Sequence, residues 1–577
     1  MNAAGLLQHF ERISEAPDAV PRLRRFVLDL AVRGKLVEQD PKDEPAAELL
    51  RRIRAEKERL VKDGKISKEK LLPLVNEDET PFDAPAGWEW VRTRQVTSDR
   101  GQTTPSEEFS YIDVTAIDKE AGRIAETKVL TADEAPSRAR KVVQAGDVIY
   151  SCVRPYLLNI AIVESEIVPP PIASTAFAVL NSFGLVHSRY LWIALRSSFM
   201  IESVEARMRG QAYPAINDSD FALLPLPLPP LTEQHRIVAK VDELMVLCDR
   251  LAAAQAEREN RRDRLAAASL HRLNNGADAE SFREHVRFHL RHLPGLTTRP
   301  EHIQELRQTI LNLAVRGKLV SQDLNDEPAH ELLKRIEKRK AHLLGEAKIK
   351  KTKACRKFDG NAVPHSVPMS WTWTMLGEIT DIGTGSTPSR TQPSFWEGGS
   401  ISWISSGSTS QSLITAGDEF VTEKAVNAHR LRLYQPGTLL VALYGQGKTR
   451  GQVATLGIES TINQACAAVC PLQGFEPMHM YLKLLLQQNY DEIRSLSAGG
   501  PQPNLNVQRI KEVLVPLPPL AEQHRIVAKV EELMALCSQL TAQLATTQNE
   551  SYCVLEAVLH EALPSSSNPS MQRLYGA

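Results

Sequence analysis

The nine residues Glu-Gln-His-Arg-Ile-Val-Ala-Lys-Val occupy positions 233–241 and occur again, unchanged, at positions 522–530. A second shared stretch, Arg-Gly-Lys-Leu-Val, lies at positions 33–37 and 316–320. The copies are 289 residues apart for the first stretch and 283 residues apart for the second. Because both stretches recur in the same order at nearly the same spacing, the 577-residue chain consists of two half-molecules in tandem.

Each half has the same order of segments: a helix, a charged linker, a globular head, a proline-rich segment and a long helix. The heads are much less alike than their flanks, which indicates one scaffold that presents two specificities. Each head opens on a Trp-x-Trp pair, and alternation along a strand puts both rings on one face, which predicts core packing. We expect five regions: an N-terminal helical region and linker at 1–81, a first head at 82–230, central helices and linker at 231–364, a second head at 365–519, and a C-terminal helix and tail at 520–577.

Apolar residues recur at helical spacing after each copy of the nine-residue stretch. They run from Ile237 to Leu251 and from Ile526 to Leu544 in alternating steps of four and three, which is typical of a coiled coil or helix pair. A helix over residues 232–270 would be about 60 Å long. The proline-rich segment at 225–230 cannot continue a helix or a central strand, so we predict a stiff extended hinge.

The heads show the mixed pattern of an α/β module with many short strands. Strand-like runs lie at 147–153 and 438–443, and each follows a turn glycine, Gly146 or Gly437. Helix-like runs lie at 190–196 and 480–488. The predicted fold class is therefore α+β, with two α/β heads joined by long helices.

Composition excludes several classes of protein. Hydrophobic residues make up 42% of the chain and charged residues 24%, as in ordinary soluble globular proteins. The formal net charge is -1, so a nucleic-acid-binding role would need local basic clusters or a partner that supplies positive charge. The seven cysteines form no Cys-x-x-Cys pair, which argues against a zinc site or a disulfide framework. Neither a signal-peptide core nor a membrane-spanning run is evident, and we expect a cytoplasmic protein with no membrane partner.

One stretch suggests a different function. The sequence Ala-Leu-Tyr-Gly-Gln-Gly-Lys-Thr at 442–449 resembles a phosphate-binding loop with Ala in place of the first Gly. The following residues, 450–454, predict a turn and a strand where such a loop requires a helix. We therefore favour a hairpin with Gln446, Lys448 and Arg450 at its tip, and keep a nucleotide hydrolase that uses Lys448 as an alternative. No other catalytic or metal-binding constellation is indicated.

Candidate DNA contacts are polar or aromatic residues near Gly or Pro in loop-like stretches of the heads. Arg and Lys can pair with guanine edges, and Asn and Gln with adenine edges. In the first head the candidates are Arg100, Gln102, Arg138, Arg140, Arg154, Tyr156, Arg207, Arg209, Gln211 and Tyr213. In the second head they are Ser386, Arg390, Gln392, Gln446, Lys448, Arg450, Gln502 and Asn504.

The repeated flanks carry a resemblance to a known family. The pattern Gly-Lys-Leu-Val-x-Gln-Asp-x-x-Asp-Glu-Pro-Ala at 34–46 and 317–329 resembles a signature of Type I restriction-modification specificity subunits. The pattern Pro-Leu-Pro-Pro-Leu-x-Glu-Gln-His-Arg-Ile-Val-Ala-Lys-Val at 227–241 and 516–530 is similar to another. The Pro-x-x-Trp-x-Trp entry to each head resembles the start of that family's target recognition domains.

The resemblance implies a subunit without catalysis of its own, in a bacterial or archaeal cell. It implies double-stranded DNA with a bipartite, asymmetric target and two methyltransferase subunits that carry S-adenosylmethionine. In complexes that also contain the motor subunits, it implies two restriction subunits that use ATP and Mg. Each target recognition domain would recognise one half-site, and antiparallel long helices would set the spacer. A scaffold that bridges proteins without contacting DNA is the second alternative.

The flanking helices are the expected docking surfaces for the methyltransferases. We expect helices at 23–37, 306–320, 237–251 and 526–540 to pack together and to present repeated polar residues. The candidate partner contacts are Arg33, Lys35, Gln234, His235, Arg236, Arg316, Lys318, Gln523, His524 and Arg525.

Overall fold

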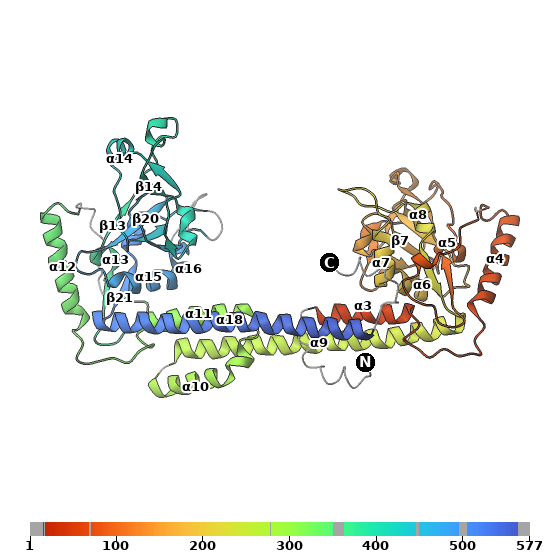
Figure 1. Ribbon diagram of the computed structural model, residues 1–577, viewed down its shortest axis with the longest axis horizontal. Coiled ribbons are helices and arrows are strands. Elements are labelled where there is room, and N and C mark those ends of the chain that lie inside the picture. Colours follow the sequence, from red (N-terminus) through yellow and green to blue (C-terminus); the bar gives the residue numbers. More distant parts are fainter. Residues whose placement is uncertain are drawn as a thin grey trace. The chain divides into compact units, whose positions relative to one another are not determined.

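The computed structural model describes residue 16 and residues 18–68, 71–276, 278–349, 363–445, 449–495 and 505–562. It divides into two compact units (Figure 1). Unit 1 contains the residues up to Arg258 together with those from Thr547 onward, and unit 2 is Glu259–Thr546. Each unit contains one head. None of the described helices is both long and apolar enough to cross a membrane.

Two long helices begin directly after the proline-rich segments. They are α9 (Leu231–Asn275) and α18 (Leu520–Ala562), with 45 and 43 residues. Neither contains an internal Pro or Gly, so no residue interrupts the helical hydrogen bonds. The predicted long helices are thus confirmed. The apolar face that begins at Ile237 and Val241 packs against the core of its own head. The periodic apolar pattern therefore indicates a helix that is attached to a head, as well as one that pairs with another helix.

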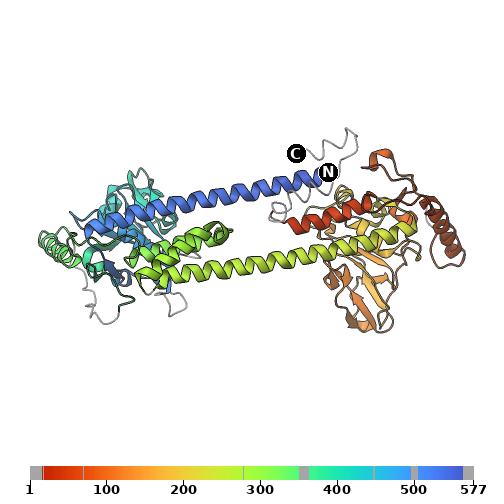
Figure 2. The same cartoon turned by 90° about the horizontal axis from the view of Figure 1, so that it is seen from below.

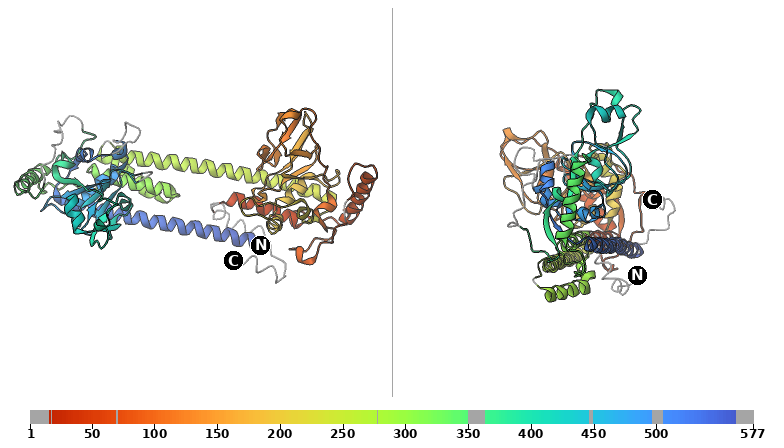
Figure 3. Two further views of the ribbon diagram at one scale, coloured as in Figure 1. Left: turned by 90° about the horizontal axis from the view of Figure 1, so that it is seen from above. Right: turned by 90° about the vertical axis from the view of Figure 1, so that its left-hand side faces the viewer.

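Shorter helices complete unit 1. The helix α3 (Ala19–Val32) runs beside the first part of α9, to which an Arg24–Asp249 ion pair links it (Figure 2). It ends five residues before the predicted end at Val37, because Gly34 adopts a φ of 65°. The helix α4 (Ala46–Lys62) stands as an arm beside the head (Figure 3).

Head 1 consists of short strands and four helices. The strands are β1 (Glu89–Arg92), β2 (Phe109–Ile112), β3 (Ile117–Asp118), β4 (Arg123–Ile124), β5 (Lys128–Leu130), β6 (Ala139–Val142), β7 (Val148–Ser151), β8 (Ile160–Ile162), β9 (Pro171–Ser174), β10 (Phe177–Leu180) and β11 (Pro225–Leu228). The helices are α5 (Thr93–Val96), α6 (Ser188–Leu195), α7 (Ser198–Glu205) and α8 (Asp218–Ala222). The strand and helix predicted at 147–153 and 190–196 are confirmed as β7 and α6.

Unit 2 contains three flanking helices besides the parts of α9 and α18. They are α10 (Ala279–Leu296), α11 (Pro300–Val315) and α12 (Ala329–Gly345). The helix α10 packs against the end of α9, where the Ser269 hydroxyl lies 2.9 Å from His289 Nδ1 (Figure 2). The helix α11 ends at Val315, five residues before the predicted end, and Gly317 again has a positive φ of 66°.

Head 2 has the same mixture of short elements. Its strands are β12 (Thr372–Met375), β13 (Thr380–Thr384), β14 (Ile401–Ile404), β15 (Leu413–Ile414), β16 (Glu419–Val421), β17 (Leu439–Ala442), β18 (Val453–Leu456), β19 (Thr461–Ile462), β20 (Cys466–Pro471) and β21 (Leu514–Leu517). Its helices are α13 (Leu376–Ile379), α14 (Glu423–His429), α15 (Met478–Gln488), α16 (Tyr490–Ser495) and α17 (Val507–Lys511). The predicted strand at 438–443 and helix at 480–488 are confirmed as β17 and α15.

The two heads share one strand topology. In head 1 the order β10-β7-β8-β4-β3 forms one sheet, and in head 2 the order β13-β20-β17-β18-β15 forms the equivalent sheet. In the smaller sheet, β2 pairs in parallel with β9 and antiparallel with β5, while β14 pairs in parallel with β19 and antiparallel with β16. Head 1 adds β3 beside β4 and β6 beside β9, and head 2 adds β13 beside β20. Heads whose sequences differ widely are therefore variants of one fold.

A two-stranded ribbon closes the base of each head. Strand β1 pairs antiparallel with β11, and β12 pairs antiparallel with β21. The hinge prediction for 225–230 was therefore wrong for its first four residues, which form a strand. Pro225 and Pro227 tolerate this because a two-stranded ribbon has outward-facing positions that need no N–H for pairing. The carbonyl of Pro227 accepts a hydrogen bond of 2.7 Å from the buried Tyr190 hydroxyl.

Both Trp-x-Trp pairs pack inside the protein, as predicted. Trp88 and Trp371 are buried, and Trp90 and Trp373 are half-buried. The main core of each unit continues from the large sheet of the head, across its base, onto the long helix. A head is therefore held to its helices by a continuous apolar core.

Candidate nucleic-acid interface

A buried carboxylate at the start of α9 fixes the base of head 1. The Trp88 indole N–H donates to Glu233 at 2.9 Å, and the Gln39 amide donates to its other oxygen at 3.1 Å. Burial raises the pKa of Glu233 above its ordinary value, and the two hydrogen bonds oppose that rise. Three segments that are distant in sequence are thereby joined at one residue.

Unit 2 repeats this arrangement. Glu522 at the start of α18 accepts hydrogen bonds from Trp371 at 3.0 Å and Gln322 at 2.6 Å. Burial raises the pKa of Glu522 as well. Each head is therefore attached to its long helix by the same contacts, which we call the base network.

An ion pair next to each base network joins the long helix to the segment that follows the first helix. Arg236 contacts Asp43 at 2.6 Å, and Arg525 contacts Asp326 at 2.6 Å. The hydrogen bond from Arg236 holds the pKa of Asp43 below its ordinary value. Both arginines were predicted partner contacts, and both have a partner within the chain.

Other predicted partner contacts have structural roles. Gln234 and Gln523 are buried, and their amides donate at 3.0 Å to the carbonyls of Pro229 and Pro518. For these two glutamines the prediction was wrong, because the chain itself encloses their side chains.

Four more predicted partner contacts lie around the helix ends. Arg316 and Lys318 donate at 2.9 and 3.0 Å to the carbonyls of Asn274 and Gly276, at the C-terminal end of α9. The Arg33 guanidinium lies over a phenylalanine ring, and Lys35 is exposed. The exposed residues of the set, Lys35, His235 and His524, remain candidates for contact with another protein.

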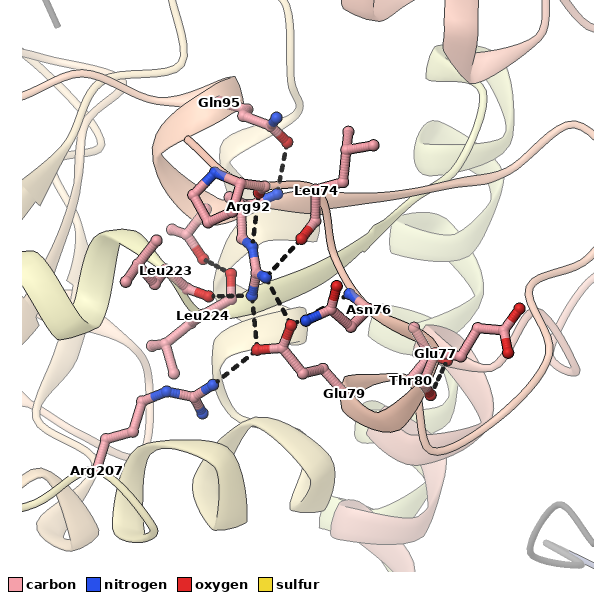
Figure 4. A network of polar contacts seen from close by, with 12 residues as sticks. Leu74, Asn76, Glu77, Glu79, Thr80, Arg92, Gln95, Arg207, Leu223 and Leu224 are labelled. Carbon is pink, nitrogen blue, oxygen red and sulfur yellow. Dashed lines mark hydrogen bonds and ion pairs between the residues drawn. The ribbon is translucent and has the colours of Figure 1, made fainter. Parts of the chain in front are cut away.

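A buried arginine clamps the linker before head 1 (Figure 4). The Arg92 side chain is 4% exposed and forms a two-pronged ion pair with Glu79 at 2.5 and 2.8 Å. It also donates to the carbonyls of Leu74 and Leu223, each at 2.7 Å. Arg207 contacts the same Glu79 at 3.1 Å, so this predicted DNA contact instead helps to hold the linker.

The hairpin between β7 and β8 brings the strongest DNA candidates to the surface of head 1. Arg154 and Leu158 flank a single helical turn and both have positive φ, 49° and 55°. Non-glycine residues rarely adopt this conformation, and such strain is concentrated at binding sites. Tyr156 on the turn is 43% exposed.

A second loop meets the tip of this hairpin. The Arg154 N–H donates at 2.8 Å to the Pro214 carbonyl, and its guanidinium lies 4.7 Å from the centre of the Tyr213 ring. Tyr213 is 70% exposed, and the neighbouring Arg209 and Gln211 are exposed too. We call the set Arg154, Tyr156, Arg209, Gln211 and Tyr213 the head 1 loop surface. The structure thus brings together five of the ten predicted contacts of this head.

Three further candidates lie along strand β6 and its neighbour. Gln102 forms an isolated bridge with Lys141 of β6. Arg140 is half-buried on β6, and Arg138 is exposed directly before it. The Thr175 N–H donates at 2.8 Å to the Arg138 carbonyl, and the adjacent Ala176 carbonyl accepts from Cys152 at the base of the hairpin. This edge is therefore next to the head 1 loop surface.

One predicted contact in head 1 is internal. Arg100 is paired at 2.6 Å with the buried Asp147, whose pKa is raised by burial although the arginine lowers it. Leaving Asp147 without its cation would be costly, so Arg100 has a structural role within the head, and its DNA contact stays a prediction.

Lys141 was missed by the sequence reasoning. It is buried, and it contacts Asp99 at 2.6 Å and Asp218 at 3.3 Å. Burial alone would lower the pKa of Lys141, but the two carboxylates raise it. This lysine ties the β6 edge to α8. Its position in a short strand gave no signal, whereas Gln39 and Asp43 could have been found because both recur 283 residues later.

In head 2 the predicted residues are more dispersed. Arg390 lies 3.8 Å from the centre of the Trp396 ring and is paired with Glu419, so it supports the smaller sheet. Gln392 is exposed, and Ser386 is half-buried with its backbone N–H bonded to Ile462 at 3.1 Å.

The stretch that resembles a phosphate-binding loop is a hairpin. Strands β17 and β18 are antiparallel neighbours, and the Gly451 N–H donates at 2.9 Å to the Ala442 carbonyl. A strand follows this stretch where a nucleotide site requires a helix, so the predicted pair of hairpin strands is confirmed. Arg450 is half-buried in the turn before β18, and the predicted tip residues Gln446 and Lys448, like Gln502 and Asn504, lie outside the described residues.

Comparison with known proteins agrees with these features. Residues 368–547 match a family model described as Type I restriction modification DNA specificity domain. The chain is 30% identical over 581 aligned positions to the Type I restriction enzyme EcoEI specificity subunit of Escherichia coli, with 94% of each chain covered. It is 30% identical over 559 positions to the EcoAI specificity subunit of the same organism, again with 94% of each covered. A crystal structure of the HsdS subunit from Thermoanaerobacter tengcongensis aligns with 26% identity and a TM-score of 0.45, over 84% of this chain and 98% of that one.

Proposed function

Because the chain belongs to the family of Type I restriction enzyme specificity subunits, we propose that each of its heads recognises one half of a bipartite DNA target. The head 1 loop surface is the observation that carries the proposal. It combines the half-buried Arg154, the exposed Arg209 and two exposed tyrosines on two loops that contact each other. Arginine can pair with guanine edges, and tyrosine can contact phosphates and bases.

The repeated base network supports two recognition modules. It attaches both heads to their helices through the same hydrogen bonds, at Glu233 and at Glu522. Since the heads share a strand topology but differ in their loops, they would present different chemistry to two different half-sites. The target is therefore expected to be asymmetric.

Partner subunits would supply what this chain lacks. We propose two methyltransferase subunits that hold S-adenosylmethionine, and restriction subunits that use ATP and Mg, within a bacterial or archaeal cytoplasm. With a formal net charge of -1, the chain depends on partners for much of the contact with DNA phosphates. Exposed residues that occur at matching positions of both copies, His235 and His524, are candidates for docking them.

The test is to sequence the methylome of a methylation-free host that expresses the chain with its methyltransferase. We expect an asymmetric bipartite adenine motif, of which one half changes when residues 82–230 are replaced by another head. An unchanged motif after the exchange, with a soluble complex, would favour the scaffold alternative.

Point variants sharpen the same experiment. Arg154→Ala and Tyr213→Ala should each lower methylation about 10- to 100-fold, since a good base or phosphate contact contributes about 1–3 kcal/mol. Arg123→Ala is the control, because Arg123 is 60% exposed in the same head but lies on β4, away from both loops. Equal effects of the three variants would contradict a localised DNA surface.

A further inference from the structure

A cavity of about 300 Å³ lies at the base of head 2. The end of α11 forms one wall, the ribbon of β12 and β21 a second, and helices α15 and α16 a third. Apolar and polar groups line it in about equal measure, and the apolar side chains include Val315, Leu485, Ile493 and Val513. Its volume is at the lower end of the range for small-molecule sites, about 300–1,000 Å³.

Aromatic rings fill the corresponding region of unit 1. Phe82, Trp90 and Phe199 form a cluster with ring centres 5.0, 5.4 and 5.9 Å apart. The Arg33 guanidinium closes this cluster, 5.1 Å from the centre of the Phe82 ring. Unit 1 therefore provides a comparison in which aromatic side chains fill the base of the head.

Unit 2 keeps part of this cluster and replaces the rest with polar groups. At the 283-residue spacing, Trp373 corresponds to Trp90 and His365 to Phe82. The rings of His365 and Trp373 meet edge to face with centres 5.1 Å apart. Gln488 and Asn489 also line the cavity. The imidazole of His365 is smaller than the phenyl ring of Phe82, so this replacement leaves space at the base of head 2.

His365 offers the cavity an unsatisfied hydrogen-bond acceptor. The imidazole is hydrogen-bonded to the Val315 backbone, and burial, together with Arg316 and Lys318, lowers its pKa. A neutral ring that donates from Nδ1 to a carbonyl carries a lone pair on Nε2. That Nε2 is buried and has no hydrogen-bond partner among the residues the structure describes. A buried acceptor without a donor is unfavourable, so a ligand N–H would be stabilised there.

The remaining polar groups favour a neutral ligand with more than one donor. Glu512 is exposed at the margin of the cavity and offers a carboxylate, while Gln488 and Asn489 carry amides that can donate or accept. Arg316 also lines the cavity, but one of its nitrogens is already bonded to the Asn274 carbonyl at 2.9 Å. Positive and negative groups are both present, so neither sign of ligand charge is selected.

We propose that this cavity is a binding site for a small, neutral, planar heteroaromatic molecule of nucleobase size. Its ring would pack against Trp373, and a ring N–H would donate to His365 Nε2. Such a ligand would bridge α11 and head 2, because residues of both line the cavity. The site is separate from the loops that the proposed function assigns to DNA.

Two probes that differ by one methyl group test the proposed hydrogen bond from a ligand ring N–H to His365 Nε2. Benzimidazole has a ring N–H, and 1-methylbenzimidazole does not. In calorimetric titrations of the full chain at neutral pH, benzimidazole should bind at least about 10-fold more tightly, which corresponds to one hydrogen bond to a buried acceptor. At ten times its Kd it should raise the Tm by about 2–4 °C. Absence of benzimidazole binding, or equal binding of both probes, would overturn the proposal.

A variant that copies the packing of unit 1 tests whether benzimidazole binds in this cavity. His365→Phe copies Phe82 and should weaken benzimidazole binding at least about 10-fold while the Tm of the free protein stays the same or rises, because the ring fills the cavity. The matched control is His479→Phe in the same head, since His479 is half-buried and lies outside the cavity lining. Unchanged binding by the His365 variant would place the ligand elsewhere and contradict the assignment.

Discussion

The base networks of the two heads consist of the same contacts, whereas the surfaces of the heads differ. The indole-to-carboxylate bond is 2.9 Å in unit 1 and 3.0 Å in unit 2, and the ion pair beside it is 2.6 Å in both. By contrast, the two hairpins that carry candidate DNA contacts have different sequences and lengths. The same residues and contacts are thus kept where each head is attached to its helix. The sequences differ where the two heads would contact different DNA half-sites.

The linkers show a second difference between the copies. Arg92 clamps the linker of unit 1, but the position 283 residues later is Met375, which cannot form an ion pair. Met375 is buried at the end of β12. A shared frame therefore does not require the same attachment of the preceding linker.

The largest expected effect is the loss of a tryptophan from the base network. Trp88→Ala should destabilise unit 1, and Trp371→Ala unit 2, each by about 3–5 kcal/mol, because a large buried ring and a hydrogen bond to a buried glutamate are lost. Hydrogen exchange resolved by segment is the appropriate measurement, since two units need not unfold together.

The control for this pair is Met369→Ala, because Met369 is fully exposed two residues before Trp371. It should leave exchange in both units unchanged. Losses for the two tryptophans that differ by more than about 2 kcal/mol would exceed ordinary context effects and would show that equal geometry does not give equal stability.

A smaller loss is expected when the linker clamp of unit 1 is converted to the residue of unit 2. Arg92→Met should cost about 2–4 kcal/mol, since it leaves Glu79 and several carbonyls without their buried cation. Protection from exchange should fall mainly in residues 71–80. Arg59→Met on α4 is the control, because Arg59 forms exposed pairs with Glu56 and Asp63 and should leave the protection of residues 71–80 nearly unchanged. An equal loss in both variants would contradict a specific clamp.

Much of this frame could be predicted from the sequence because it is repeated. Helical periodicity from Ile237 predicted α9, and strand-like runs predicted β7 and β17. The pairing of β11 with β1 was missed because prolines weaken the local signal for a strand, and tertiary pairing overrode it.

The candidate site was harder to predict than the fold. Arginines in loop-like stretches look alike in sequence, but Arg100 and Arg207 are partly buried and paired with carboxylates. Arg209 also pairs with a carboxylate, Asp220, but its side chain is 76% exposed, and Arg154 lies beside the Tyr213 ring. Which acid faces which base is decided by pairing between residues tens of positions apart. A single sequence contains no local signal for that choice.

The glycines that end the first helix of each copy give a more moderate test. Gly34→Ala and Gly317→Ala should each cost about 2–3 kcal/mol in stability. Both positions have a left-handed backbone conformation that alanine disfavours, and the added Cβ would overlap Pro85 or Pro368. Gly64→Ala separates the two causes, since Gly64 has a φ of 69° with open space around it and should cost only about 1 kcal/mol. Equal losses at Gly34 and Gly64, measured by denaturant unfolding, would mean that the contact with the proline has no energetic weight.

The smallest effect is a pH dependence that both base networks should share. Burial raises the folded-state pKa of Glu233 and Glu522, so folding favours their protonated forms. The resulting stabilisation is present below the unfolded-state pKa of about 4.5 and is lost as pH rises through the folded-state pKa. Relative to wild type, Glu233→Gln and Glu522→Gln should therefore become more stable as pH rises from about 4 toward neutrality, by about 1 kcal/mol or less, because hydrogen bonds from Trp and Gln offset much of the burial.

Denaturant unfolding across this pH range, with each variant compared with wild type at every pH, isolates the two glutamates from other titrating groups. Glu107→Gln, which removes an exposed carboxylate of head 1, should give a difference from wild type that barely changes over the range. Curves of the same sign and size for Glu233 and Glu522 would extend the equivalence of the two frames from geometry to energetics. A difference that moves in the opposite direction with pH would mean that the hydrogen bonds from Trp88 and Gln39 outweigh burial, and that the carboxylate is favoured in its charged form.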